Sequence, residues 1–130
     1  MSSVRCTCQQ VIRDTGEDLP YKARFLPDQN VESLHRSVSS ALSELVSLAS
    51  RNQQQEWIGK YMRKGYPMEM DTPSLIHDFI WGVVVANTGL AYECGNCGRL
   101  LIYRKTDASA KSFVPEAPSK GIFNRIPSNV

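Results

Sequence analysis

The spacing of apolar residues predicts an amphipathic helix over residues 29–50. Apolar side chains recur there at alternating three- and four-residue steps, and the opposite face is mostly serine. Asp28 stands where a helix cap is expected. The same spacing could form a coiled-coil dimer, but the heptad positions that flank such a seam, e and g, lack the paired opposite charges of a coiled coil. We therefore expect the apolar face to pack within the chain. The apolar positions are Val31, Leu34, Val38, Ala41, Leu45 and Leu48.

A second, shorter helix is predicted around Trp57 and Ile58. Tyr61 and Met62 continue the same stripe one turn later. We expect this helix to end at Gly65, because glycine is the usual residue just after a helix.

A third helix is predicted between residues 71 and 87. Asp71 or Thr72 supplies its cap, and Asn87-Thr88-Gly89 supplies its C-terminal end. Its wide apolar face predicts a central, buried position in the fold. That face consists of Leu75, Ile76, Phe79, Ile80, Val83 and Val84.

The segments on either side of the helices predict short strands. Residues 4–12 are typical of a strand interrupted at Cys6-Thr7-Cys8, and residues 21–26 alternate between apolar and basic side chains. Residues 90–103 predict a β-hairpin, and residues 111–114 a further strand. The chain is therefore predicted to be an α+β protein, with a small antiparallel sheet and two or three helices inserted between its first and last strands.

The length of the chain and the composition of its last residues predict one domain followed by a short tail. The chain has 130 residues, enough for one domain with its own core, and we assign that domain to residues 1–116. Residues 117–130 contain two prolines and a glycine and favour a partly disordered C-terminal tail. The net charge of +2 does not by itself indicate nucleic acid, although the chain from Arg99 onward is basic.

The sequence predicts a cytoplasmic protein. The first ten residues lack the apolar stretch of a secretory signal, and no apolar run approaches the ~20 residues of a membrane span. In a reducing compartment, paired cysteines bind metal more often than they form disulfides.

The four cysteines form two close pairs at opposite ends of the chain. Cys6 and Cys8 are separated by one residue, and Cys94 and Cys97 by two. Gly95 and Gly98 free the second turn to bring backbone amides toward the thiolates. Gln9 occupies the position after a cysteine pair where such a turn often has glycine. We therefore predict one four-thiolate metal site around which the small sheet is built.

Zinc is the favoured ion, because four thiolates complete a tetrahedron and leave no position for substrate water. An iron–sulfur cluster uses the same ligands and stays open as an alternative. A redox pair at Cys94 and Cys97 is the third possibility, but such motifs usually open a helix, and this one lies between two strands.

No catalytic set accompanies the cysteines. The only histidines, His35 and His77, have no spacing that suggests shared ligation, and His77 and Asp78 should point in different directions on their helix. Phosphate-binding and dinucleotide-binding motifs are absent from the sequence. The chain is therefore predicted not to be an enzyme.

Two groups of residues are candidates for contact with a partner. Trp57, Tyr61 and Tyr66 form an aromatic patch, for which core packing is the alternative. The basic C-terminal third supplies the second group, with Arg99, Arg104, Lys105 and Phe123. If the partner were nucleic acid, these cations would contact phosphates, which is the alternative function.

Three sequence segments together resemble a group of small, mostly uncharacterised bacterial cytosolic proteins. They are Cys6-x-Cys8, the segment Leu19 to Ala23 followed by Asp28, and Tyr92 to Leu100 with its Cys-x-x-Cys-Gly-Arg-Leu sequence. In size and lack of a catalytic set the chain is also similar to immunity proteins, which neutralise a cognate antibacterial toxin by covering its active site. The resemblance implies a metal-stabilised, non-enzymatic protein-binding protein, with a secreted toxin as the expected partner and no membrane association.

Overall fold

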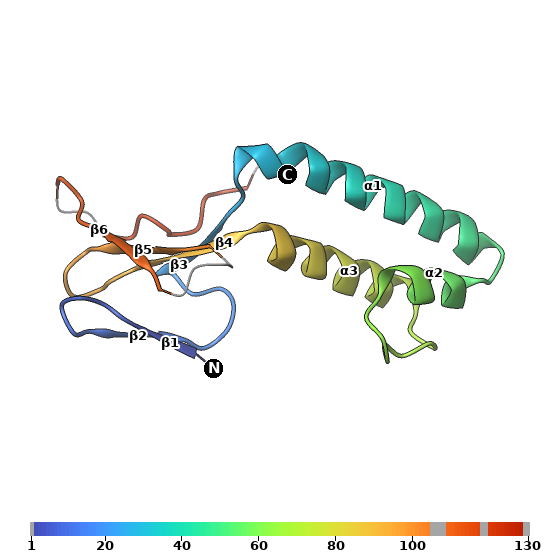
Figure 1. Ribbon diagram of the computed structural model, residues 1–130, viewed down its shortest axis with the longest axis horizontal. Helices are drawn as coiled ribbons and strands as arrows, with labels where there is room; N and C mark the ends of the chain where they lie inside the picture. Colours follow the sequence, from blue (N-terminus) through green and yellow to red (C-terminus); the bar gives the residue numbers. More distant parts are fainter. Residues whose placement is uncertain (1, 105–108, 118–119, 129–130) are drawn as a thin grey trace. The chain divides into compact units, whose positions relative to one another are not determined.

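The computed structural model describes residues 2–104, 109–117 and 120–128. These residues form two compact units (Figure 1). The sheet unit contains residues 1–25 and 88–130, and the helical unit contains residues 26–87. The order of elements confirms the predicted α+β class, since all three helices lie between the third and fourth strands.

A β-hairpin begins the sheet unit. Strand β1 (Ser2–Arg5) pairs antiparallel with β2 (Val11–Asp14), in a register that places Val4 opposite Ile12. Both of these side chains are buried, while their neighbours along each strand are exposed or half-buried. One face of the hairpin is therefore apolar and lies against the rest of the unit.

The remaining four strands form one antiparallel sheet in the order β3-β4-β5-β6. The central pair is the predicted hairpin, and the strand before the helices pairs with the strand directly after them. The helical unit is thus an insertion between two neighbouring strands. The strands are β3 (Lys22–Phe25), β4 (Gly89–Glu93), β5 (Leu100–Tyr103) and β6 (Lys111–Phe113).

Gly89 has a different role from the predicted helix cap. It is the first residue of β4, and a side chain at this position would place Cβ 2.2 Å from the ring of Phe25. Glycine is needed here because the aromatic ring of the neighbouring strand packs directly against the backbone.

A polar cluster, which we call the Asp14 clasp, joins the hairpin to the sheet. The Asp14 carboxylate accepts hydrogen bonds from the Tyr92 hydroxyl at 2.6 Å and from Lys22 Nζ at 3.0 Å. Burial tends to raise the pKa of Asp14, but these hydrogen bonds outweigh it and hold the pKa below its ordinary value. The three residues come from β2, β3 and β4, so the cluster fixes the hairpin against two strands of the sheet.

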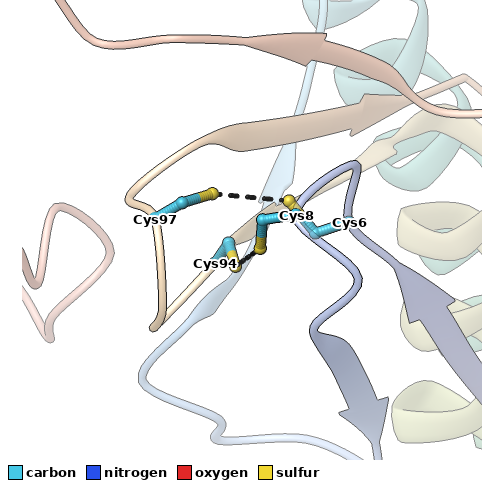
Figure 2. A group of neighbouring side chains, drawn as sticks. All are labelled: Cys6, Cys8, Cys94 and Cys97. Carbon is cyan, nitrogen blue, oxygen red and sulfur yellow. Dashed lines mark hydrogen bonds between the residues drawn. The ribbon is translucent and has the colours of Figure 1, made fainter.

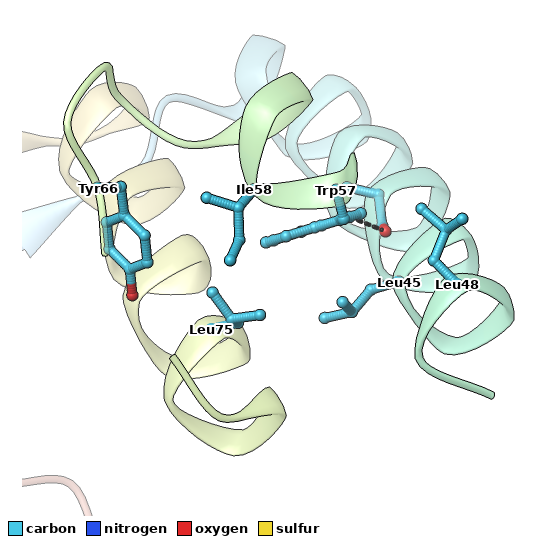
Figure 3. Close-up of a cluster of buried hydrophobic side chains, with 7 residues drawn as sticks. Leu45, Leu48, Trp57, Ile58, Tyr66 and Leu75 are labelled. Atoms are coloured by element: carbon cyan, nitrogen blue, oxygen red, sulfur yellow. Dashed lines mark hydrogen bonds between the residues drawn. The ribbon is translucent and has the colours of Figure 1, made fainter. Parts of the chain in front are cut away.

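The helical unit has three helices, α1 (Asp28–Ser50), α2 (Gln54–Tyr61) and α3 (Thr72–Asn87). Figure 3 shows its core, in which α2 packs against both long helices. The Trp57 side chain is fully buried there, and its indole N–H donates to the Ala41 carbonyl at 2.8 Å. The core is formed by Ala41, Leu45, Leu48, Trp57, Ile58, Tyr66 and Leu75.

The ends of the helices match the predictions only in part. The Asp71 carboxylate accepts a hydrogen bond from the Ser74 amide at 3.2 Å, as expected of a cap for α3. The prediction for Asp28 was wrong, because Asp28 is the first residue of α1 and no side chain caps that helix. Helix α2 ends at Tyr61, four residues before Gly65, which lies in the following turn with a φ of 86°.

The predicted central position of α3 was also wrong. Of its residues only Leu75 is buried, although nearly the whole second half of the helix is apolar. Ile80, Trp81 and Val85 keep 38%, 41% and 36% of their surface exposed. The short helix α2 covers only one part of the hairpin formed by α1 and α3. Among the described residues, no helix has both the length and the apolar composition needed to span a membrane.

Candidate metal centre

The four cysteine side chains converge in the sheet unit, as Figure 2 shows. All four sulfurs lie within 4.8 Å of one another. Two close contacts join different ends of the chain, with Cys6 Sγ 3.5 Å from Cys97 Sγ and Cys8 Sγ 3.6 Å from Cys94 Sγ. The predicted meeting of the two cysteine pairs is therefore confirmed.

The first cysteine turn, residues 6–10, connects β1 to β2. The Cys6 amide donates to the Gln10 carbonyl, and the Gln9 amide donates back to the Cys6 carbonyl, both at 2.9 Å. Gln9 follows the second cysteine and has a φ of 77°, in the left-handed region. This conformation places the Gln10 backbone amide where it lowers the pKa of Cys8.

The second cysteine turn, residues 94–99, connects β4 to β5 in the same way with one residue more. The Cys94 amide donates to the Arg99 carbonyl, and the Gly98 amide donates to the Cys94 carbonyl, both at 2.8 Å. Gly98 has a φ of 75°, and the Arg99 backbone amide lowers the pKa of Cys97. The single extra residue corresponds to the difference between Cys-x-Cys and Cys-x-x-Cys.

The two turns thus place equivalent groups on opposite sides of one site. Gln9 and Gly98 have nearly the same φ, which confirms that a residue other than glycine fills the expected glycine position. Gly95 does not have this role, since its φ is not positive and a Cβ there would meet nothing within 4 Å.

The surroundings favour the thiolate form at the two half-buried cysteines, Cys97 and Cys8. The Arg99 amide and guanidinium lower the pKa of Cys97 to about 6. The Asn96 side-chain amide lies 3.5 Å from Cys8 Sγ, and its hydrogen bond lowers the pKa of Cys8. Burial raises the pKa of Cys94 to about 11, so this thiol needs a cation to ionise at neutral pH.

The arrangement fits a single tetrahedral ion. With metal–sulfur bonds of about 2.3 Å, four thiolates around one zinc ion stand about 3.8 Å apart. The sulfurs here all lie within 4.8 Å of one another, and the Cys6–Cys97 and Cys8–Cys94 separations of 3.5 Å and 3.6 Å are close to that value. The four cysteines could therefore bind one metal ion with little rearrangement.

The other predicted contact residues are not gathered in one place. Trp57 and Tyr66 belong to the buried core of the helical unit, so core packing, the alternative considered above, is what the structure shows for them. Tyr61 is half-buried, and its hydroxyl donates a hydrogen bond to Glu44.

The predicted basic group lies in the sheet unit. Arg99 is beside Cys97, and Arg104 is exposed. Phe123 is half-buried and lines a cavity of about 350 Å³ together with Arg125 and Asp18. Lys105 is outside the described residues, as are residues 118–119 and 129–130 of the predicted tail.

The histidines are both exposed. His77 Nδ1 lies 3.1 Å from Asp78 Oδ1, so the expectation that these neighbours point apart was wrong. The rotamers of two adjacent exposed side chains on a helix are not fixed by the helical period alone.

Asn96 is a residue of the site that the sequence pattern did not single out. Its amide reaches Cys8 on the other turn, 88 residues away in the sequence. The pattern of cysteines and glycines identifies the turns, but not the side chains that bridge from one turn to the other.

Comparison with known proteins identifies the family and no related fold. No solved structure matches this chain. A family model described as "Domain of unknown function (DUF8617)" matches residues 2–117, which include all four cysteines and every strand and helix of the described residues. The chain therefore belongs to the DUF8617 family.

Proposed function

We propose that the four cysteines bind one structural zinc ion and that the protein acts by binding another protein, without catalysing a reaction. The observation that carries this proposal is the convergence of four thiols from two matching turns within 4.8 Å. All four tetrahedral positions are filled by the chain, so a bound ion has no open position for a substrate or a water molecule.

The spacing of the sulfurs supports a single ion over an iron–sulfur cluster. In a four-iron cluster each thiolate binds a different iron, and the sulfurs stand further apart than around one ion. In a two-iron cluster only thiolates on the same iron are close, whereas here all four sulfurs lie within 4.8 Å of one another, and Cys6 and Cys97 approach to 3.5 Å. That separation matches the edge of one metal–sulfur tetrahedron.

Metal analysis of the purified protein tests the site directly. We expect one zinc per chain and no visible absorption from iron and sulfide. Replacing zinc with cobalt should give the strong d–d bands of a tetrahedral thiolate complex. A Cys97→Ser variant should retain less metal. A Thr7→Ser variant is the control, because Thr7 lies between two ligands in the sequence but is not itself a ligand, and it should retain all of the metal. Wild-type protein without stoichiometric metal would contradict the proposal.

The more specific prediction, an immunity protein that neutralises a bacterial toxin, rests on resemblance. Its test is co-expression with the toxin domains encoded next to the gene, followed by measurement of toxin activity and of complex formation. Stoichiometric binding with loss of toxin activity is expected. Absence of any neighbouring toxin, or of protection against one, would remove the specific prediction and leave the metal site unaffected.

Nucleic-acid binding is a second candidate because the charge is unevenly divided between the two units. The sheet unit carries ten Lys or Arg against six Asp or Glu, whereas the helical unit carries five against seven. Binding through the sheet unit should weaken steeply with salt, since each phosphate contact releases counterions. A titration with mixed single-stranded RNA and DNA at two salt concentrations decides this, and a flat response excludes it.

A further inference from the structure

The C-terminal segment of the sheet unit lies on the face of the sheet that points away from the candidate metal centre. We call its described part, residues 120–128, the strap; in Figure 1 it passes over the sheet, in red. Side chains alternate between the two faces of a strand, and in β4 Tyr92 and Cys94 lie in the core with the β1–β2 hairpin. Glu93, between them, therefore points to the other face, where it meets the strap.

Glu93 holds the strap by its backbone. This residue is 9% exposed, and its carboxylate accepts hydrogen bonds from the backbone amides of Gly121 at 2.9 Å and Ile122 at 3.4 Å. Two successive amides of this kind can cradle an anionic group. A buried carboxylate without donors is strongly unfavourable, so Glu93 needs N–H groups at this position. The donors come from a segment 28 residues further along the chain.

The strap presents these amides through a turn. Gly121 has a φ of 75°, which favours glycine, and the Asn124 amide donates to the Gly121 carbonyl at 3.0 Å. Phe123 lies within this turn and is half-buried, and Arg125 beyond it forms an ion pair with Asp18 at 2.9 Å. The features that the sheet unit contacts are therefore a glycine turn, an aromatic ring and a cation, each of which a second polypeptide could supply.

The strap is held loosely in spite of the demand for donors at Glu93. Ile122 and Ile126 are 55% and 85% exposed, and both side chains of the Arg125–Asp18 pair are exposed. A cavity of about 350 Å³ remains between Phe123 and residues 17–24. Exposed ion pairs contribute little to stability, and a gap in the packing loses dispersion contacts. The segment that satisfies the buried carboxylate is thus only weakly fixed by its other contacts.

The receiving residues and the strap also differ in their relation to the family. The family match covers residues 2–117, so Asp18 and Glu93 lie within the matched domain and the strap lies outside it. The receiving site is therefore a feature of the domain, and the strap is the segment that fills it in this chain.

We propose that the strap is an exchangeable occupant of a peptide-binding site centred on Glu93. The other occupant is a segment of a partner protein with the same chemistry, a glycine turn with two free amide donors followed by an aromatic and then a basic side chain. This deepens the protein-binding half of the proposed function and rests on it. It does not involve the metal, so zinc analysis and peptide binding report separately on the two halves.

A labelled synthetic peptide of residues 120–128, titrated into the full-length protein and followed by fluorescence anisotropy, tests the proposal. The tethered strap competes at an effective concentration of about 1 mM, so the wild type should bind the peptide weakly. Phe123→Ala loosens the strap without changing the receiving residues and should bind the peptide at least fivefold more tightly. Ile126→Ala is the matched control, because this strap side chain is 85% exposed, and it should bind like the wild type.

A double-mutant cycle tests whether the peptide occupies the place of the strap. In the Phe123→Ala background, Asp18→Asn should weaken binding of the peptide about threefold, since exposed ion pairs have small effects. The same change should not affect binding of an Arg125→Gln version of the peptide. Asparagine tolerates the positive φ of 62° at residue 18, so the backbone is not disturbed. Glu69→Gln, at an exposed residue of the helical unit, is the control and should have no effect.

Glu93→Gln tests the centre of the site. In the Phe123→Ala background it should weaken peptide binding at least tenfold, because it replaces a charged acceptor with an amide that also carries donors. Zinc content and the circular dichroism spectrum are measured for this variant, since Glu93 adjoins Cys94. The Asp18 cycle decides the question if Glu93→Gln does not fold.

Three results would overturn the proposal. The first is a wild type whose Gly121 amide exchanges with solvent as fast as in an unfolded peptide, because the strap would then not be bound. The second is equal binding of the peptide to the wild type and to Phe123→Ala, or no binding to either at about 1 mM. The third is a wild-type dimer that the free peptide dissociates, which would show that the other occupant is the strap of a second copy.

Competition separates this inference from the proposed function. A partner protein that displaces the labelled peptide from Phe123→Ala is the expected result. A partner that binds without displacing it would overturn the inference and leave the protein-binding function standing. A protein that binds the peptide but contains no zinc would contradict the metal half of the proposed function and support the peptide-binding site.

Discussion

Gln9 has a backbone conformation that L residues rarely adopt, and this makes it a sensitive test of the first cysteine turn. Its φ is 77° and its side chain is exposed. The left-handed conformation costs an ordinary residue about 1–2 kcal/mol, a cost that glycine does not have. We predict that Gln9→Gly raises the free energy of unfolding by about 1 kcal/mol, measured by urea denaturation of the metal-loaded protein.

Gln10 provides the control for this prediction. It is the next residue, it is also exposed, and its φ is not positive. Gln10→Gly should lower the stability slightly, because it only adds freedom to the unfolded chain. Equal effects of the two substitutions would show that the conformation of Gln9 is not a source of strain.

The Asp14 clasp predicts a specific pH dependence. The carboxylate of Asp14 is 11% exposed, and its hydrogen bonds to Tyr92 and Lys22 hold its pKa below the ordinary value of 3.8. A depressed pKa means that the carboxylate stabilises the folded state above about pH 4, and that this contribution is lost as the pH falls through the folded-state pKa. Asp14→Asn should therefore reduce the free energy of unfolding at pH 7 by about 1–3 kcal/mol.

The difference between wild type and Asp14→Asn should shrink as the pH is lowered from 5 to below 4. Both proteins lose metal as the thiolates protonate, so the comparison at each pH isolates the contribution of the carboxylate. A difference that stays constant down to pH 3, measured by urea denaturation, would mean that Asp14 acts through packing and not through its charge.

At the scale of the element, α1 predicts a sharp contrast between neighbouring residues. Leu45 is fully buried against α2 and α3, whereas Val46, the next residue, is 69% exposed. Leu45→Ala should destabilise the helical unit by about 3 kcal/mol, because it removes buried surface and leaves a cavity. Val46→Ala should change the stability by less than about 0.5 kcal/mol. Thermal unfolding followed by circular dichroism at 222 nm measures both, and similar losses would contradict the observed register of α1.

The elements most accurately predicted from the sequence are those with a strong apolar periodicity or with clear capping residues at their ends. The helix predicted over residues 29–50 is found at Asp28–Ser50, and the Asp71 cap begins α3 as expected. The strands predicted over residues 21–26, 90–103 and 111–114 are present within one or two residues of their expected ends. In these segments local sequence and tertiary packing favour the same structure. The single interrupted strand predicted over residues 4–12 was wrong, because the chain reverses at the cysteine turn and forms the antiparallel hairpin of β1 and β2.

The failures occur where tertiary contacts override a local signal. Gly89 was expected to end a helix, but it begins β4 because the Phe25 ring packs on its backbone. The apolar face of α3 was expected to be central, but α2 is only eight residues long and covers only part of it. No sequence pattern predicted the Asp14 clasp, because Asp14 and Tyr92 are 78 residues apart and neither belongs to a motif.

The cysteine site was easier to predict than its surroundings. Cysteine is rare and its pairs are closely spaced, so the ligands were evident from the sequence. The geometry that orients them depends on single backbone conformations and bridging side chains. Gln9 and Asn96 are ordinary polar residues until the fold places them beside a sulfur.

At the scale of the whole molecule, the chain has two cores that differ in what holds them together. The helical unit has a core of seven buried residues and contains no cysteine. In the described part of the sheet unit, two of the six buried core residues are the cysteines Cys6 and Cys94. A metal ion would therefore contribute directly to one core and not to the other.

Metal removal should separate the stabilities of the two units. We predict that a strong chelator unfolds the sheet unit first, because the bound ion offsets the repulsion and burial of four converging thiolates and joins the two ends of the chain. Hydrogen exchange should then show fast exchange for the amides of β4 and β5, while the amides in the second half of α1 stay protected. The circular dichroism signal at 222 nm should be largely retained, since all three helices lie in the helical unit.

A variant with all four cysteines replaced by serine is the control for this experiment. It should resemble the chelated protein and should not respond to chelator. If the helices of the wild type instead lost protection in parallel with the strands, the two units would form one cooperative structure. The metal would then stabilise the whole chain, and the insertion of the helical unit between β3 and β4 would transmit that stabilisation through the two connections at residues 25–26 and 87–88.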